Sequence, residues 1–364
     1  MLITLSAKPM AVKMTRILRT GVIGVGQQGK SHLRSYKACQ KAKVVAVSDI
    51  NEDLAKSVAA EYGVDRYCAH YDDLLALDKV DALSVCTPVF THSSIVCDAA
   101  AAGKHVLCEK PMAMNAAEAQ RMLDACRNAG VKLGIASSRS RLKGQVILAK
   151  KYISDGKLGK IYYARSTTLR RRGRPFELKT ADWFMDSHKA GGGALIDIGC
   201  YDIDVVLYLL GSPQPISASA VTFKGIGKTP SLNTTYDVEE HASVFVRFND
   251  GSSATFEVAW ASNMESMENI ALFGTEGGLK LDPFTYYAVI DNSWAAFSVD
   301  MHPRWVRDNL GTTTYIDDFV DACLTNRDPL TPGEDGLKVM QIINMAYISA
   351  ERGREVAIDE ISAK

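Results

Sequence analysis

The stretch "GVIGVGQQGKSH", residues 21–32, decides the fold of this chain. An apolar run leads into it, and its glycines fall in the order Gly-x-Gly-x-x-Gly. After a strand and before a helix, this pattern permits a tight turn and places the positive end of the helix against a pyrophosphate. The residues predicted to bind a dinucleotide here are Gly24, Gly26, Gln27, Gln28 and Gly29.

Asp49 lies twenty residues after Gly29, at the end of the apolar run "KVVAVSD" (residues 43–49). A carboxylate at this position accepts hydrogen bonds from the adenosine ribose hydroxyls and repels a 2′-phosphate. NAD is therefore the predicted cofactor, with NADP as the alternative. A structural turn that binds nothing is disfavoured because the strand, the helix and the acidic residue all fit the motif.

Short apolar runs alternate with helical stretches up to about residue 137. The runs are "TGVIGVG", "KVVAVSD", "ALSVCTP", "HVLCEKP" and "VKLGIAS". Continuous apolar runs are typical of strands buried on both faces, as in a parallel sheet. The helical stretches, residues 51–63 and 115–130, both end at a glycine. Residues 1–138 are therefore predicted to form an α/β Rossmann domain with a doubly wound parallel sheet.

The pattern changes after residue 139. Residues 243–260 alternate apolar and polar side chains about an Asn-Asp-Gly turn, which predicts a hairpin. Further strands are expected at residues 160–171, 216–223, 269–274 and 278–282, and a helix with Thr331 as its cap at 331–353. Residues 139–364 are predicted to form an α+β domain with a mostly antiparallel open sheet, which binds substrate and mediates oligomerisation.

Charge and composition exclude several classes of partner. The chain has 42 basic and 42 acidic residues, so its formal net charge is zero. Proteins that bind nucleic acid or membrane surfaces usually have a basic excess, so neither partner is expected. The seven histidines lack metal-ligand spacing and the eight cysteines lack a Cys-x-x-Cys pair, so no metal is predicted.

The N-terminal residues do not read as a signal peptide. Their apolar positions are interrupted by Lys8, Pro9 and Lys13. We expect residues 1–16 to be a flexible extension, or translation to start at Met14. Cysteines within apolar runs indicate buried, reduced thiols, so a cytoplasmic location is expected.

Several motifs between residues 82 and 119 carry a resemblance to a known family. With the glycine motif upstream, Thr87-Pro88, His92, residues 102–105 and Glu109-Lys110-Pro111 closely resemble the Gfo/Idh/MocA oxidoreductases. The resemblance resumes at "GGGALIDIGCYDIDVVLYLLG" (residues 191–211) and covers residues 19 to about 358. It implies that the cofactor site also includes Thr87, Pro88, His92, Glu109 and Lys110.

The second family motif is Asp-x-Gly-x-His-x-x-Asp. This chain has Asp197, Gly199, Tyr201 and Asp204 there, so only the histidine is changed. Tyrosine also occurs at this position within the family. The change therefore concerns the proton carrier more than the class of enzyme. A second departure is Val89, where many relatives have asparagine after Thr-Pro.

Hydride transfer between an alcohol and nicotinamide needs a group that takes or returns the hydroxyl proton. Lys110, at the carboxyl end of a predicted strand, is expected to polarise the substrate oxygen and to lower the pKa of Tyr201, the predicted proton carrier. Asp197, one helical turn before Tyr201, is expected to position the substrate or Lys110. The alternatives are an exposed lysine, a packed tyrosine and a helix-capping aspartate.

Three further residues are candidates for contact with substrate. Trp183 could stack on a sugar ring, His188 precedes the glycine run, and Arg170 opens a basic segment. Each has an ordinary alternative, because aromatic residues fill gaps and charged residues are usually solvated.

Three functions remain open from the sequence. The first is a dehydrogenase or ketoreductase acting on a secondary hydroxyl of a sugar, glycoside or cyclitol. The second is a glycosidase that oxidises its substrate transiently with bound NAD, and the third is a dinucleotide-binding regulator without activity. A homodimer or homotetramer is expected, because the predicted helices suffice to cover one face of the second sheet.

Overall fold

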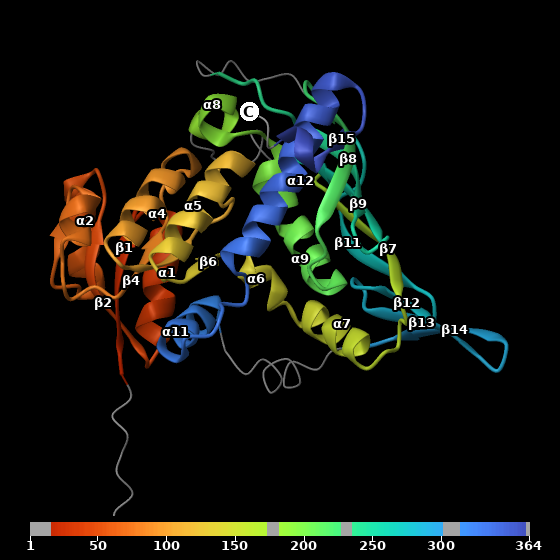
Figure 1. The fold of residues 1–364 in the computed structure, drawn as a ribbon, viewed down its shortest axis with the longest axis horizontal. Helices are drawn as coiled ribbons and strands as arrows, with labels where there is room; N and C mark the ends of the chain where they lie inside the picture. The colour runs from red at the N-terminus through yellow and green to blue at the C-terminus, as the bar shows by residue number, and fades with distance from the viewer. Residues whose placement is uncertain (1–15, 173–181, 227–234, 301–313, 362–364) are drawn as a thin grey trace, which may run out of the picture.

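The computed structural model describes residues 16–172, 182–226, 235–300 and 314–361. Apart from Arg16, the predicted N-terminal extension and the alternative start at Met14 lie outside these residues. Figure 1 shows a first sheet with its helices on the left, a large second sheet on the right, and helices α9 and α12 between them. The two predicted architectures are therefore present in one molecule.

The first sheet is parallel throughout, with strand order β3-β2-β1-β4-β5-β6. Its strands are β1 Leu18–Ile23, β2 Ala42–Ser48, β3 Tyr67–Cys68, β4 Ala82–Val85, β5 His105–Cys108 and β6 Leu133–Ile135. Every residue of β4 is buried, as the continuous apolar run predicts. The strand order reverses between β1 and β4, and such a switch point creates a binding crevice at the carboxyl ends of the strands.

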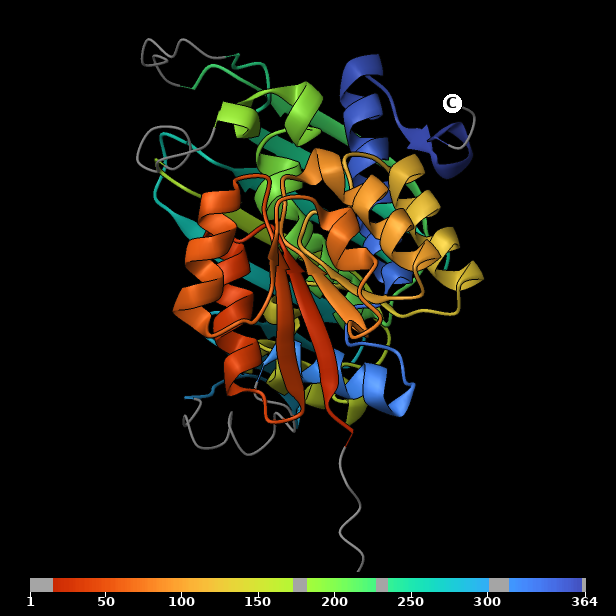
Figure 2. The ribbon, with the colours of Figure 1, turned by 90° about the vertical axis from the view of Figure 1, so that its left-hand side faces the viewer.

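Helices cover both sides of the first sheet (Figure 2). They are α1 Gln27–Ala38, α2 Glu52–Tyr62, α3 Tyr71–Leu75, α4 His92–Ala101 and α5 Ala116–Asn128. The Asn115 side chain accepts a hydrogen bond from the Glu118 backbone N–H, and α2 ends at Gly63 in the left-handed conformation. The predicted Rossmann fold is confirmed.

The second sheet has nine strands in the order β14-β13-β12-β11-β7-β10-β9-β8-β15. They are β7 Ile161–Leu169, β8 Pro215–Phe223, β9 His241–Phe248, β10 Ser253–Ala259, β11 Met267–Gly274, β12 Gly277–Lys280, β13 Thr285–Ile290, β14 Ser293–Ser298 and β15 Val356–Ala357. The β7–β10 pairing is parallel and the other pairings are antiparallel. In the predicted hairpin, Val244 pairs with Phe256.

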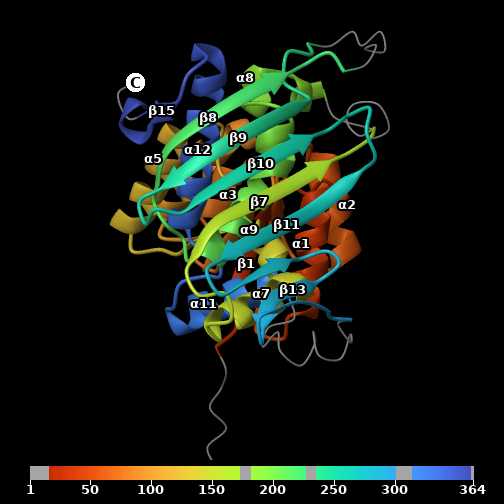
Figure 3. The same ribbon diagram turned by 90° about the vertical axis from the view of Figure 1, so that its right-hand side faces the viewer.

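One face of the second sheet is covered by helices. They include α6 Ser138–Arg141, α7 Gly144–Ser154, α9 Cys200–Leu210 and α12 Gly333–Arg352. Helix α12 packs on β8, and α9 packs on β7 and β10. The described residues place no helix over the opposite face (Figure 3). Short helix α8, Ser187–Ala190, precedes the glycine run at one end of the sheet.

Helix α11, Tyr315–Thr325, crosses the predicted domain boundary. It packs on α1 and β1, and Ile316 and Phe319 share a buried core with Leu18 and Val22. The first packing unit thus includes a segment from late in the chain. The sequence pattern indicates an amphipathic helix but does not indicate which sheet buries it.

The predicted cap of α12 is wrong. The helix begins at Gly333, and the Thr331 hydroxyl is buried with no hydrogen-bond partner in the described structure. The Thr331 carbonyl accepts a hydrogen bond from the Ile135 N–H, which holds this residue in an extended conformation against β6. Glu334, in the first turn of the helix, forms an ion pair with Arg127.

Candidate active site

The glycine turn after β1 has the geometry of a dinucleotide cradle. Gly24 has a φ of +81°, and a Cβ on Gly29 would lie 2.0 Å from the Gly24 carbonyl oxygen. Both positions therefore require glycine. At Gly26 a Cβ would meet nothing within 4 Å, and no side chain caps the start of α1 there. The first N–H groups of α1 thus face open space, which fits a pyrophosphate.

Asp49 lies directly after β2, beside the glycine turn. Its carboxylate oxygens accept hydrogen bonds from the backbone N–H groups of Val25, at 2.9 Å, and Asn51, at 3.0 Å. These contacts fix the carboxylate at the edge of the turn, where it fits the ribose hydroxyls of a dinucleotide.

A cavity of about 480 Å³ lies between the two domains. It is lined by predicted cofactor-binding residues of the first domain and by residues of the second domain. Its lining includes Gly26, Gln27, Gln28, Thr87, Pro88, His92, Glu109, Lys110, Trp183, Phe184, Ile196 and Asp197. Trp183 stacks on Phe184 with ring centroids 3.9 Å apart.

His92 lines this cavity and holds two of its loops together. It is 1% exposed, and its ring nitrogens lie 3.0 Å from the Pro111 carbonyl oxygen and 2.9 Å from that of Thr87. Burial lowers the pKa of His92, which favours the neutral ring. The histidine therefore ties together the loops that follow β4 and β5. The Lys110–Pro111 peptide bond in the second loop is cis.

Glu109 anchors the backbone of Lys110. Its buried carboxylate accepts hydrogen bonds from the Lys110 N–H at 3.0 Å and the Arg139 guanidinium at 2.6 Å, and lies 2.9 Å from His32 Nε2. Burial alone would raise the pKa of Glu109, but His32 and Arg139 together hold it below its usual range. Sequence reasoning missed His32 and Arg139, although His32 ends the glycine motif.

Lys110 joins the two domains. Its Nζ donates to Asp197 Oδ1 at 2.9 Å and to the Asp197 carbonyl at 2.7 Å. Burial alone would lower the pKa of Lys110, but its anionic and polar neighbours, Asp197 first among them, raise it above its ordinary value. At neutral pH the lysine is therefore an ammonium, which polarises an oxygen but cannot accept a proton.

Trp260 fixes the other oxygen of the Asp197 carboxylate. Its indole N–H donates to Asp197 Oδ2 at 3.1 Å, and the side chain is fully buried. Sequence reasoning missed this contact, because the tryptophan reads as the end of a predicted strand. With Lys110 and Trp260 on its two oxygens, the carboxylate has a defined orientation.

Tyr201 lies beside this pair, as predicted. Its ring centroid is 4.7 Å from Lys110 Nζ and 5.8 Å from the Arg139 guanidinium carbon. The predicted fall in its pKa is wrong, however. Burial raises the pKa of Tyr201, and the charges of Lys110 and Arg139 oppose this only in part. Both cations lie over the ring and already pair with carboxylates, whereas burial removes the water that would solvate a phenolate.

The glycine run before Asp197 permits a close approach to Glu239, which lies just before β9. A Cβ on Gly193 would lie 1.9 Å from the Glu239 carbonyl oxygen. The Glu239 carboxylate accepts hydrogen bonds from the N–H groups of Gly193, at 2.8 Å, and Leu195, at 2.9 Å. A π-helical turn, Leu195–Gly199, then carries Asp197, and Tyr201 follows in the first turn of α9. Such turns are frequent at functional sites.

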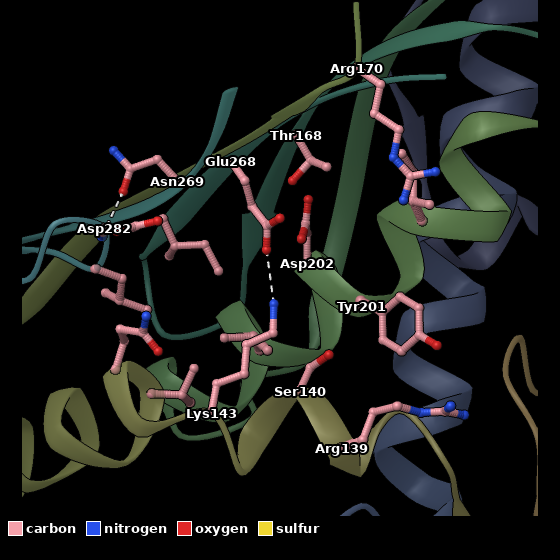
Figure 4. Close-up of a pocket in the computed structure, with 16 residues that line it drawn as sticks. Arg139, Ser140, Lys143, Thr168, Arg170, Tyr201, Asp202, Glu268, Asn269 and Asp282 are labelled. Carbon is pink, nitrogen blue, oxygen red and sulfur yellow. Dashed lines mark hydrogen bonds and ion pairs between the residues drawn. The ribbon is translucent and has the colours of Figure 1, made fainter. Parts of the chain in front are cut away.

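A second cavity, of about 350 Å³, lies next to Tyr201 (Figure 4). Arg170 lines this cavity, and Trp183 lines the first one. His188 is exposed on α8 and lines neither cavity, so its position gives no support to the predicted contact with substrate.

Sites of two other kinds are absent from the described ranges. No three side chains among histidine, cysteine, aspartate and glutamate converge there as metal ligands. No helix in the same ranges has the length and apolar character to cross a membrane.

Comparisons with known proteins agree with this architecture. Residues 18–137 match the model of an oxidoreductase family with an NAD-binding Rossmann fold, and residues 146–280 match the C-terminal domain of Gfo/Idh/MocA proteins. The chain is 30% identical to D-glucoside 3-dehydrogenase of Escherichia coli K12, over 94% of this chain and 97% of that protein. It is 26% identical to myo-inositol 2-dehydrogenase of Thermotoga maritima, over 94% and 99% of the two chains.

A solved structure shares the whole fold. Levoglucosan dehydrogenase in complex with NADH superposes with a TM-score of 0.83 at 24% identity, over 94% of this chain and 99% of that one. The similarity extends across both domains. The chain therefore belongs to the Gfo/Idh/MocA family of NAD-binding oxidoreductases.

Proposed function

We propose that this protein is an NAD-dependent dehydrogenase that transfers a hydride between nicotinamide and a secondary hydroxyl or ketone of a sugar, glycoside or cyclitol. The observation that carries the proposal is the contact of the Lys110 ammonium with Asp197, beside Tyr201 and at the end of the cavity that begins at the glycine turn. The substrate class is supported by the relatives named for dehydrogenation of a glucoside and of an inositol.

Each residue of the site has a distinct part in this reaction. The dinucleotide, when bound, supplies the hydride acceptor or donor. The glycine turn and Asp49 hold its phosphates and ribose. Lys110 stabilises negative charge on the substrate oxygen, and Asp197 holds the lysine in place. Tyr201 returns a proton to that oxygen in ketone reduction and removes it in alcohol oxidation.

The alternatives make different products. An elimination mechanism would cleave a glycosidic bond without net change in NADH, whereas a dehydrogenase forms a ketone and NADH. The relatives are named dehydrogenases, which favours net oxidation. The presence of Lys110, Asp197 and Tyr201 in contact speaks against a regulator without activity. Incubation with a panel of sugars, glycosides and inositols, followed by absorbance and product analysis, decides among the three; bond cleavage without NADH would contradict the proposal.

The cofactor preference can be tested at Asp49. We expect NAD to bind at least about tenfold more tightly than NADP, because a like-charge contact near the surface readily costs more than the ~1.4 kcal/mol that this ratio requires. Asp49→Ala should lower the ratio of NAD affinity to NADP affinity. Asp53→Ala, a change at an exposed residue of α2, should leave this ratio unchanged. Fluorescence titration with both cofactors measures this, and tighter binding of NADP to the unaltered protein would refute it.

We propose a homodimer or homotetramer formed through the uncovered face of the second sheet. Val221 and Phe223 on β8 are 64% and 58% exposed, and exposed apolar patches on a sheet favour association. Val221→Arg should therefore shift the protein to monomers at micromolar concentration in light scattering. Tyr67→Arg, at an exposed position of β3 in the first sheet, serves as the comparison. A monomeric unaltered protein would rule the proposal out.

We also propose that the protein acts in the cytoplasm. Its eight cysteines are all unpaired, and free thiols persist in a reducing compartment.

A further inference from the structure

The second cavity contains buried polar groups that the reaction described above does not use. Thr168 and Asp202 line this cavity, and Thr168 Oγ1 and Asp202 Oδ2 are buried without a direct hydrogen-bond partner in the described structure, as is Oγ of Ser166, which does not line it. Ser166 is only 1% exposed. Buried polar atoms almost always have a partner. The Thr168 and Ser166 hydroxyls are close enough to lower the pKa of Asp202 by hydrogen bonding, although not in direct hydrogen-bond geometry, so a ligand in the cavity would supply the missing donors.

Thr168 and Asp202 face each other from two elements. Ser166 and Thr168 lie on β7, two positions apart and therefore on the same side of the strand. Asp202 lies in the first turn of α9, and Figure 4 shows its carboxylate pointing toward Thr168 across the cavity. The Tyr201 hydroxyl points away from Asp202 in the same view. Tyr201 and Asp202 are neighbours in the chain and both line the second cavity, but their side chains point in different directions.

The charges around Asp202 leave its carboxylate without a cation of its own. Lys143, the nearest candidate, forms an ion pair with Glu268 at 2.8 Å. The pKa of Asp202 is raised to about 6, mainly by burial and in smaller part by the charge of Glu268, whereas hydrogen bonding by Thr168 and Ser166 and the charge of Lys143 oppose the rise. The other charged residues lining the cavity are Arg139, Arg170 and Asp282. An unpaired buried carboxylate is costly, so the surroundings favour a ligand with hydroxyl donors over an anion.

We propose that Asp202 and Thr168 form a specificity subsite that binds two neighbouring hydroxyls of the substrate, remote from the carbon that is oxidised. This inference rests on the proposed function, because it concerns the same substrate. A carboxylate accepts hydrogen bonds from both hydroxyls of a vicinal diol, and the Thr168 hydroxyl accepts or donates a third. A cavity of about 350 Å³ has the size of a small-molecule site.

The test removes the hydroxyls and their proposed partner separately. The rate of oxidation with NAD is measured for methyl β-D-glucoside, myo-inositol and their monodeoxy derivatives. The unaltered protein is compared with Asp202→Asn and with Thr168→Val. We expect loss of one particular hydroxyl to lower kcat/KM of the unaltered protein by about 10–100-fold, since an acceptor built for that hydroxyl is left unpaired. Asp202→Asn should lower kcat/KM for the parent compound by a similar factor, mainly through KM, and should no longer discriminate against the deoxy derivative.

Thr167→Val is the matched control, because Thr167 alternates with Thr168 on β7 and lines the opposite side of the sheet. It should leave kcat, KM and the discrimination unchanged. Asp202→Asn should also leave the melting temperature equal or higher, since it removes an unpaired buried charge. A large fall in melting temperature with intact discrimination would assign Asp202 a structural role and overturn the subsite.

The pH dependence gives an independent measurement. As the pH falls through about 6, Asp202 gains a proton and loses acceptor strength, so KM of the unaltered protein should rise. The KM of Asp202→Asn should stay flat over the same range. A matching rise in that variant would contradict the assignment.

The failure of the subsite differs from the failure of the proposed function. If the unaltered protein oxidises the polyols and Asp202→Asn keeps the same hydroxyl discrimination, the subsite is wrong and the function stands. If calorimetry in the presence of NAD shows Asp202-dependent binding without hydride transfer, the subsite stands and the function is wrong. If no polyol binds to the unaltered protein with NAD present, both are wrong.

Discussion

Replacement of Lys110 by methionine is expected to lower the rate of hydride transfer by about 10²–10⁴-fold, the range typical of a charged group that acts in the transition state. Methionine keeps much of the length of the side chain and removes the ammonium. NAD affinity should change little, because we propose that the glycine turn and Asp49 hold the adenosine and phosphate portions. Stopped-flow absorbance with saturating NAD and substrate measures the rate, and a separate fluorescence titration measures NAD affinity.

The same variant should also be less stable, and a second substitution separates the two effects. Lys110 and Asp197 have side chains only 14% and 7% exposed, and removal of one partner from a buried ion pair typically costs about 3–5 kcal/mol. Lys110→Met with Asp197→Asn should recover most of that stability, because the amide no longer needs a cation, but none of the activity. Lys30→Met, at a pair near the surface, is the control. Recovery of turnover in the double variant would show that Lys110 serves only to neutralise Asp197.

The sequence predicted best what local chain geometry determines. The glycines at 24, 26 and 29 and the acid at 49 are read from a turn, a helix start and a strand end, all within thirty residues. Each is where the motif requires it. Lys110 was predicted from the resemblance of Glu109-Lys110-Pro111 to the family pattern, together with its place after a buried strand whose end faces the crevice.

Contacts between distant segments could not be predicted in this way. Trp260 reaches Asp197 across 63 positions and Arg139 reaches Glu109 across 30, and no spacing rule connects them. The raised pKa of Tyr201 has the same origin. Of its two cations, Lys110 was predicted and Arg139 was not, and the burial that outweighs them depends on how two domains close over the ring.

Tyr201→Phe is the second large effect we expect. Loss of the hydroxyl should lower turnover by about 10²–10⁴-fold if it transfers the proton. Folding should be little affected, because the hydroxyl makes no hydrogen bond to another described residue and the ring remains between Lys110 and Arg139. The losses in Tyr201→Phe and Lys110→Met should not multiply in the double variant, since groups that act on one oxygen act as a unit. Stopped-flow rates and thermal denaturation of all three variants test this.

The pH profile distinguishes a proton carrier from a packing residue. Oxidation requires the phenol to lose its proton, and its pKa lies above the ordinary value of 10, so the oxidation rate should rise with pH throughout the range from 7 to 10. Ketone reduction uses the protonated phenol and should not show this rise. Tyr201→His restores the residue of the family pattern, and because histidine titrates near 6.5, the rise should move to lower pH. If Tyr201→Phe retains both the rate and the rise, the tyrosine only packs, and the proton leaves through another group beside Lys110.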